Sequence, residues 1–137
     1  MLKVEHIGIA VKKLSSAIPL FEKLLNTPCY KTETVTTEQV NTAFFKQGET
    51  KIELLESVHA EGVIARYIEK RGEGMHHIAF EVEDIRAEMK RLVQEGFVLL
   101  NEEPKKGADN KLVCFLHPKT TNGILIELCE DISCAKK

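Results

Sequence analysis

The stretch Met75–Ile85, "MHHIAFEVEDI", has the form of a short apolar strand that opens with histidine and runs through charged residues into a helix start. Val4–Leu14, "VEHIGIAVKKL", has the same form near the beginning of the chain. A shift of 71 residues places His6 on His77, and the apolar and small positions that follow then coincide. A match at a fixed shift indicates an internal structural repeat.

The match returns near the end of each half. The segment "KIELLE", Lys51–Glu56, falls on "LIELCE", Leu125–Glu130, at a shift of 74 residues. Each half therefore carries a histidine near its start and a glutamate near its end. The four residues are His6 and Glu53 in the first half, and His77 and Glu127 in the second.

Hydrophobic periodicity predicts a βαβββ unit in each half. In the first unit we expect a helix at 14–25, N-capped by Ser15 or Ser16, and strands at 6–11, 30–37, 40–45 and 51–55. In the second we expect a helix from an Asp84 N-cap to 95, and strands at 77–82, 97–100, 112–116 and 124–129. The expected organisation is one domain, 1–132, made of module 1 (about 1–60), a linking helix (about 62–72) and module 2 (about 75–130), followed by a tail at 133–137.

Strand side chains alternate between the two faces of a sheet, and this alternation sorts the repeated residues. We expect the apolar face of each strand to pack on the helices. The histidines and glutamates then lie on the opposite face. At the C-terminal end, the residues expected to face the helices are Ile124, Ile126 and Leu128.

A carboxylate in mid-strand between apolar neighbours is costly unless it is paired or bound to metal. Two histidines and two glutamates from equivalent halves form a four-ligand nitrogen and oxygen set, which suits zinc, cobalt, nickel or manganese. A single histidine at a strand start is more often a hydrogen-bonded core residue, so the paired repetition carries this prediction. The repeat selects His77 rather than His76 as ligand. His59 and His117 have no counterpart and are expected in loops or turns.

Composition bounds the class of protein. The chain has 137 residues, 43% hydrophobic and 29% charged, with a formal net charge of −2, which is typical of one globular domain. Nothing in this balance favours a nucleic-acid or membrane partner, and the N-terminus lacks the pattern of a signal peptide. The four cysteines, Cys29, Cys114, Cys129 and Cys134, form no CxxC pair. We expect reduced cysteines in a cytoplasmic protein.

Five segments carry a resemblance to a known family. They are "HIGIAV" at His6, "KIELLE" at Lys51, "KRGEGMHHIAFEV" at Lys70–Val82, "FLHPK" at Phe115–Lys119 and "NGILIEL" at Asn122–Leu128. With them the chain resembles the vicinal oxygen chelate superfamily and, within it, the methylmalonyl-CoA epimerases. The resemblance implies an α+β fold in which two tandem βαβββ modules form a partly open, eight-stranded mixed β-barrel around one divalent metal ion, with cobalt the first choice.

The resemblance also implies a function. It points to a homodimeric enzyme that interconverts (2R)- and (2S)-methylmalonyl-CoA by abstracting the C2 proton through a metal-stabilised enolate. It implies His6, Glu53, His77 and Glu127 as metal ligands. Glu127 is our first candidate for one acid/base group, and Glu53 or a water molecule is the candidate for the other. Some family members carry a second glutamate on the third strand, whereas Val40–Phe45 contains no acid and Thr42 stands at about that place. Cations that could meet the CoA phosphates are Lys111, Lys119 and Arg71, with Lys105 and Lys106 as further candidates.

Two other functions are compatible with such a fold. A glyoxalase I-like lactoylglutathione lyase would use the same metal set, but the "HPK…GILIEL" segment favours the epimerase. A metal-free small-molecule binding module would not need the histidine and glutamate set.

Overall fold

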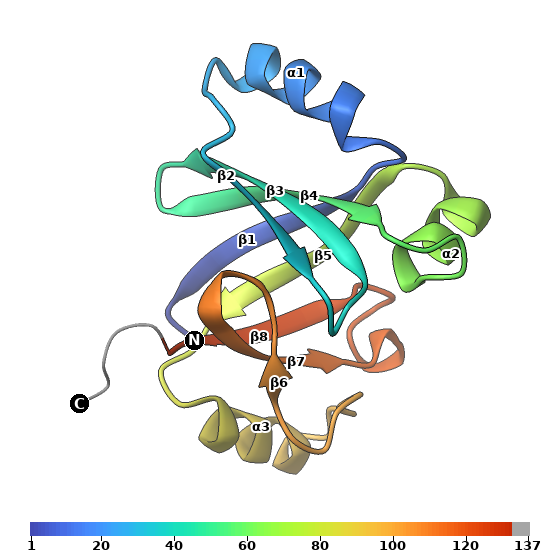
Figure 1. The fold of residues 1–137 in the computed structure, drawn as a ribbon. Coiled ribbons are helices and arrows are strands. Elements are labelled where there is room, and N and C mark those ends of the chain that lie inside the picture. Colours follow the sequence, from blue (N-terminus) through green and yellow to red (C-terminus); the bar gives the residue numbers. More distant parts are fainter. Residues whose placement is uncertain (133–137) are drawn as a thin grey trace. The chain divides into compact units, whose positions relative to one another are not determined.

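The computed structural model describes residues 1–132, so the expected tail at 133–137 lies outside the described residues. The described part contains three α-helices and eight strands (Figure 1). Their bounds are β1 Lys3–Ala10, α1 Leu14–Leu25, β2 Lys31–Val35, β3 Val40–Gln47, β4 Thr50–Ser57, α2 Val63–Arg71, β5 Gly74–Glu81, α3 Ile85–Gln94, β6 Lys105–Lys106, β7 Lys111–Leu116 and β8 Ile126–Asp131. The strands form a mixed sheet in the order β2-β3-β4-β1-β5-β8-β7-β6, which confirms the expected fold class of two βαβββ modules.

The chain divides into two compact units. The first unit is His6–His76, and the second unit is Met1–Glu5 together with the described chain from His77 onward. Strand β1 contributes to both, because its opening residues belong to the second unit and its remainder to the first. In the second unit, the Leu2 backbone N–H donates to the carbonyl of Glu81 over 2.8 Å.

In the first unit, β1 runs parallel to β4, and β4, β3 and β2 follow in antiparallel pairs. Helix α1 lies along one face of this sheet (Figure 1). The residues packed beneath it are apolar, buried or partly buried, and come from alternate positions on the sheet. They include Ile9, Val11, Ala43, Phe45, Ile52 and Leu54, packed with Ile18, Phe21 and Leu25 of the helix. The expectation that the apolar face of each strand packs on a helix therefore holds for Ile52 and Leu54 of β4.

The start of α1 differs from the prediction. The helix begins at Leu14 and its N-cap is Lys13, whose side chain makes no capping hydrogen bond. Ser16 is already inside the helix, and its hydroxyl donates to the Lys13 carbonyl over 3.2 Å. Pro19 lies inside the helix, beyond its first turn. Burial of the apolar face of α1 stabilises the helix where local capping does not.

In the second unit, β5 runs parallel to β8, and β8, β7 and β6 follow in antiparallel pairs. Helix α3 packs on this sheet through Ile85, Met89 and Leu92, together with Leu116 and Leu128. Its N-cap is Asp84, as the sequence predicts, and the Asp84 carboxylate accepts from the Ala87 backbone N–H over 3.1 Å. The Glu130 carboxylate of β8 accepts from the Ile85 N–H over 2.9 Å and ties the start of α3 to the sheet.

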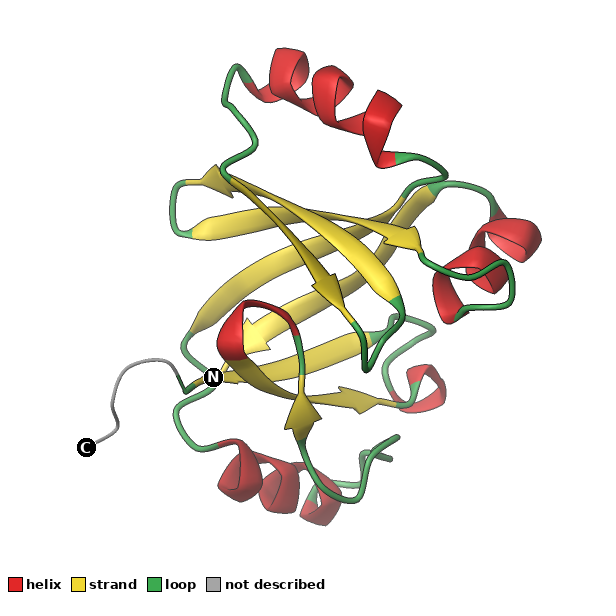
Figure 2. Ribbon diagram, in the orientation of Figure 1, coloured by secondary structure: helices red, strands yellow, loops and turns green. Residues whose placement is uncertain are grey.

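Two strand predictions in the second half are wrong. Residues 97–100 form no strand, since Leu99 makes only an isolated bridge to Leu116, and the strand that pairs with β7 is the two-residue β6 (Figure 2). Phe97 and Leu99 instead contact the core beneath α3 as part of a loop, which explains their apolar character. Ile124 precedes β8 and is 47% exposed, so of the three residues expected to face a helix only Ile126 and Leu128 do so. Within residues 1–132, no helix combines the length and apolar character needed to cross a membrane.

Candidate metal centre

The first unit brings His6 and Glu53 together. Strands β1 and β4 are parallel neighbours, and their register places Gly8 beside Glu53. His6 Nδ1 lies 3.2 Å from Glu53 Oε2. His6 is 6% exposed and Glu53 is 3% exposed, so both ionisable groups are removed from water. The pair lies on the sheet face opposite α1, as the alternation predicts.

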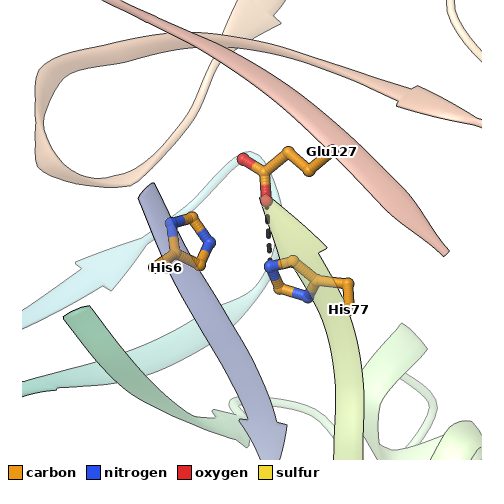
Figure 3. A group of neighbouring side chains, drawn as sticks. All are labelled: His6, His77 and Glu127. Carbon is orange, nitrogen blue, oxygen red and sulfur yellow. Dashed lines mark ion pairs between the residues drawn. The ribbon is translucent and has the colours of Figure 1, made fainter. Parts of the chain in front are cut away.

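The second unit repeats this arrangement with His77 and Glu127. His77 Nε2 lies 2.9 Å from Glu127 Oε1, the ion pair marked by the dashed line in Figure 3. Both residues are 6% exposed. His77 comes from β5 and Glu127 from β8, the parallel neighbours that correspond to β1 and β4. The Phe115 ring meets the His77 imidazole edge-on, with ring centroids 5.8 Å apart.

The neighbours of the two glutamates are also equivalent. In the first unit Glu53 lies between Gly8 on the parallel strand and Phe44 on the antiparallel strand. In the second unit, the corresponding positions beside Glu127 are occupied by Ala79 and Phe115. A small residue on one side leaves room for the carboxylate, and an aromatic residue occupies the position on the other side. The repeat in sequence is thus a repeat of the site.

The chemistry of this donor set fits a divalent metal ion. In each unit one imidazole and one carboxylate supply nitrogen and oxygen donors without thiolate, the type that binds first-row divalent ions. Buried carboxylates are strongly destabilising unless a cation or hydrogen-bond donors compensate their charge. Each glutamate has a histidine beside it, and a bound divalent ion would add positive charge next to the carboxylate.

The other three histidines, His59, His76 and His117, pack against an aromatic ring or lie in turns. His76 points away from His77 and packs edge-on against Tyr67 of α2, with ring centroids 4.8 Å apart. His117 Nδ1 accepts from the Lys119 backbone N–H over 3.0 Å and caps the turn at 118–120. His59 lies in the turn between β4 and α2. The predictions that His59 and His117 belong to loops or turns are confirmed.

The cations predicted to contact substrate have different surroundings. Lys111, at the start of β7, is 6% exposed, and its Nζ lies 3.8 Å from Glu5 Oε2 and 3.6 Å from Asp131 Oδ2. Arg71 is exposed at the end of α2, where its guanidinium lies 5.9 Å from the centre of the Tyr67 ring. Lys119 is exposed in the turn that follows β7.

Sequence reasoning missed Glu5 as a buried acid. Glu5 directly precedes His6 in β1 and is only 3% exposed. Its carboxylate pairs with Lys111, from a strand more than a hundred residues later in the chain. The shift of 71 residues places Glu5 on His76, so the repeat that singled out His6 gave no signal for an acid at position 5.

Residues 5–115 match the Glyoxalase/Bleomycin resistance protein/Dioxygenase superfamily. The chain belongs to this superfamily. Within it, the chain is 40% identical over 128 residues to an ethylmalonyl-CoA/methylmalonyl-CoA epimerase of Cereibacter sphaeroides, a match that covers 92% of this chain and 96% of the relative. The resemblance to methylmalonyl-CoA epimerases expected from the sequence is therefore confirmed.

Two further comparisons extend this result. The chain is 38% identical over 130 residues to YqjC of Bacillus subtilis, an uncharacterized protein, covering 95% of this chain and 93% of the relative. Among solved structures, it superposes on a methylmalonyl-CoA epimerase in complex with methylmalonyl-CoA and NH4+ with a TM-score of 0.92 and 29% identity, covering 97% of this chain and 96% of the other.

Proposed function

We propose that this protein is a metal-dependent epimerase that interconverts (2R)- and (2S)-methylmalonyl-CoA. The observation that carries the proposal is the duplicated histidine–glutamate pair, buried in equivalent places in both units. Relatives and structural neighbours named as methylmalonyl-CoA epimerases support the choice of substrate.

We propose His6, Glu53, His77 and Glu127 as the ligands of one divalent ion. Three of them, His6, His77 and Glu127, are drawn together in Figure 3. When bound, such an ion supplies Lewis-acid stabilisation of the negative charge that develops on the acyl oxygens as the C2 proton leaves. Cobalt is our first choice, as the family resemblance implies, with zinc, nickel and manganese as the alternatives for this donor set.

The proton transfers are assigned to Glu127 and Glu53. Epimerisation requires that one group remove the C2 proton from one face of the carbon while another delivers a proton to the opposite face. In the first unit, the face of β3 on the side of Glu53 carries Val40, Thr42 and Phe44, none of which can act as a base. Glu53 is a buried carboxylate on that face, so we assign it the role that the third strand leaves unfilled.

In the forward direction, the C2–H bond breaks and its proton passes to one carboxylate. The other carboxyl group, protonated beforehand, donates its proton to the opposite face of C2. The two groups exchange roles in the reverse direction, so no net proton is consumed. The imidazoles of His6 and His77 hold the two carboxylates in place, through the contacts at 3.2 Å and 2.9 Å.

We propose that basic side chains bind the CoA phosphates. Arg71 and Lys119 are exposed and can contact an anion directly. Lys111 remains in the proposal, but its ion pairs with Glu5 and Asp131 would have to rearrange before it contacted a phosphate. We further propose a homodimer, as the resemblance implies, and a cytoplasmic location, which the free thiols of Cys29, Cys114 and Cys129 favour.

The test follows C2 of one methylmalonyl-CoA epimer in deuterated water. The metal-loaded protein should exchange the C2 proton with solvent and form the other epimer, and a chelator should stop both together. Glu127→Gln and Glu53→Gln should each lower turnover on the order of 100-fold, as for loss of an acid/base group. Glu56→Gln is the matched control, because Glu56 lies on β4 but on the opposite face.

Formation of lactoylglutathione from the methylglyoxal–glutathione adduct, without C2 exchange on methylmalonyl-CoA, would replace the proposal with a glyoxalase function. Full epimerase activity in exhaustively chelated protein would refute the metal dependence alone.

A further inference from the structure

Thr42 is a buried hydroxyl without a hydrogen-bond partner. The residue is 1% exposed. Among the buried side-chain oxygen and nitrogen atoms of the described residues, Thr42 Oγ1 is the one that has no hydrogen-bond partner. A second threonine of the same hairpin, Thr34, does have a hydrogen-bond partner, because its hydroxyl donates to Asn41 Oδ1 over 2.7 Å. A buried polar group that forms no hydrogen bond is destabilising, so its presence requires an explanation.

Strand register places Thr42 on the face that carries Glu53. On β3, Phe44 pairs with Glu53 and Thr42 pairs with Leu55 of β4. Positions two apart on a strand share a face, so Thr42 and Glu53 are diagonal neighbours on one face of the sheet. Such neighbours lie about 7–8 Å apart, within reach of the two ends of one small acyl group.

The surroundings of Thr42 explain why its hydroxyl has no partner within the unit. The residues beside it on the same face of β3 are Val40 and Phe44, and the residue opposite it on β4 is Leu55. All three are apolar and offer no acceptor. On β2 its partner in register is Glu33, which lies 3.8 Å from Lys31 Nζ through its Oε1. Packing alone would be served equally well by valine, which has nearly the same shape as threonine.

We propose that the Thr42 hydroxyl hydrogen-bonds an oxygen of the substrate's acyl group and so helps to select acyl groups that carry an acceptor at that position. The inference rests on the proposed function and adds a substrate-binding residue to it. Because the hydroxyl is buried, the contact forms as the acyl group enters, by displacement of neighbouring side chains. The hydroxyl proton turns about the Cβ–Oγ1 bond, so the donor can be directed at an acceptor without movement of the backbone.

The test compares Thr42→Val, which removes the hydroxyl and keeps the shape, with Thr42→Ser, which keeps the hydroxyl. Thr34→Val is the matched control, because it makes the same replacement in the same hairpin on the opposite face. The net contribution of one hydrogen bond corresponds to a change of roughly 2- to 13-fold in binding. Thr42→Val should therefore raise the KM for methylmalonyl-CoA within this range, while Thr42→Ser and Thr34→Val stay within about twofold of wild type.

A binding measurement separates this role from a structural one. Thr42→Val should unfold at the same temperature as wild type or higher, because it removes an unsatisfied buried group, yet its stabilisation by added methylmalonyl-CoA should be smaller. Unchanged KM and unchanged ligand stabilisation in Thr42→Val, with wild-type protein active, would overturn the role of Thr42 and leave the proposed function standing. Wild-type protein without C2 exchange on methylmalonyl-CoA would overturn both.

Discussion

At the scale of single residues, the neighbouring histidines of β5 have different surroundings and can be compared directly by mutation. His77 is buried beside Glu127, whereas His76 packs against Tyr67 on the other side of the strand. We expect His77→Ala to lose bound metal and activity while the fold persists, since removal of a ligand commonly costs several kcal/mol of metal binding. Metal content by elemental analysis and circular dichroism would measure the two effects.

His76→Ala is the control for this prediction and should keep its metal. If His77→Ala bound a full equivalent of metal, the ligand assignment would be wrong. If His76→Ala lost the metal instead, the ligand would be the other member of the pair.

The reactivity of the Cys114 thiol gives a second prediction for a single residue, because it depends on how deeply the thiol is buried. The thiol is 0% exposed, and burial raises its pKa to about 11, so it remains protonated near neutral pH. We expect iodoacetamide at pH 8 to label the half-buried Cys29 much faster than Cys114 in native protein, and both at similar rates in denaturant. Peptide mass spectrometry over time would measure the two rates, and equal rates in native protein would contradict the buried placement of Cys114.

The raised pKa of the Cys114 thiol also determines how this group changes the free energy of unfolding with pH. Its pKa is higher in the folded chain than the ordinary value of 9.0. Between pH 9 and about 11 the unfolded chain therefore releases a proton that the folded chain retains. Cys114 thus lowers the free energy of unfolding as pH rises through this range and has no such effect below it.

At the scale of elements, the two sheet-covering helices begin differently. Helix α3 has a side-chain cap from Asp84, whereas α1 begins at Lys13 without one. We expect Asp84→Ala to lower the free energy of unfolding by about 1 kcal/mol, because the Ala87 N–H loses its acceptor. Urea unfolding of the variant against wild type would measure the loss.

Asp84→Asn is the control for the cap, since asparagine offers an equivalent oxygen and should remain within a few tenths of a kcal/mol of wild type. An Asp84→Ala protein as stable as wild type would mean that the Glu130 contact to Ile85 alone is sufficient to hold the start of α3.

At the scale of the whole molecule, a metal ion held by all four proposed ligands would stabilise the folded chain. A ligand that binds only the folded state at 100 times its Kd adds about 2.7 kcal/mol to the free energy of unfolding. We therefore expect metal-loaded protein to unfold at a higher temperature than chelated protein, which thermal unfolding by circular dichroism would measure. The unfolding temperature of His77→Ala should be the same with and without metal. If the unfolding temperature of the wild-type protein were also unchanged by metal, the protein would not hold the ion tightly.

The sequence alone was enough to predict the two βαβββ units, the Asp84 cap and the repeated histidines and glutamates. These features have a local period or a repeated spacing, and side-chain alternation converts such patterns directly into faces. The wrong predictions concern segments whose local pattern is ambiguous. The apolar stretch at 97–100 packs as a loop, and Ile124 is exposed just before β8.

Only the tertiary structure revealed the burial of Glu5 with Lys111, the unpartnered hydroxyl of Thr42, and the matching Gly8 and Ala79 beside the two glutamates. Each depends on which residues become neighbours across strands that are far apart in the chain. Strand register decides those neighbours, and register is set by the packing of the whole sheet rather than by any one segment.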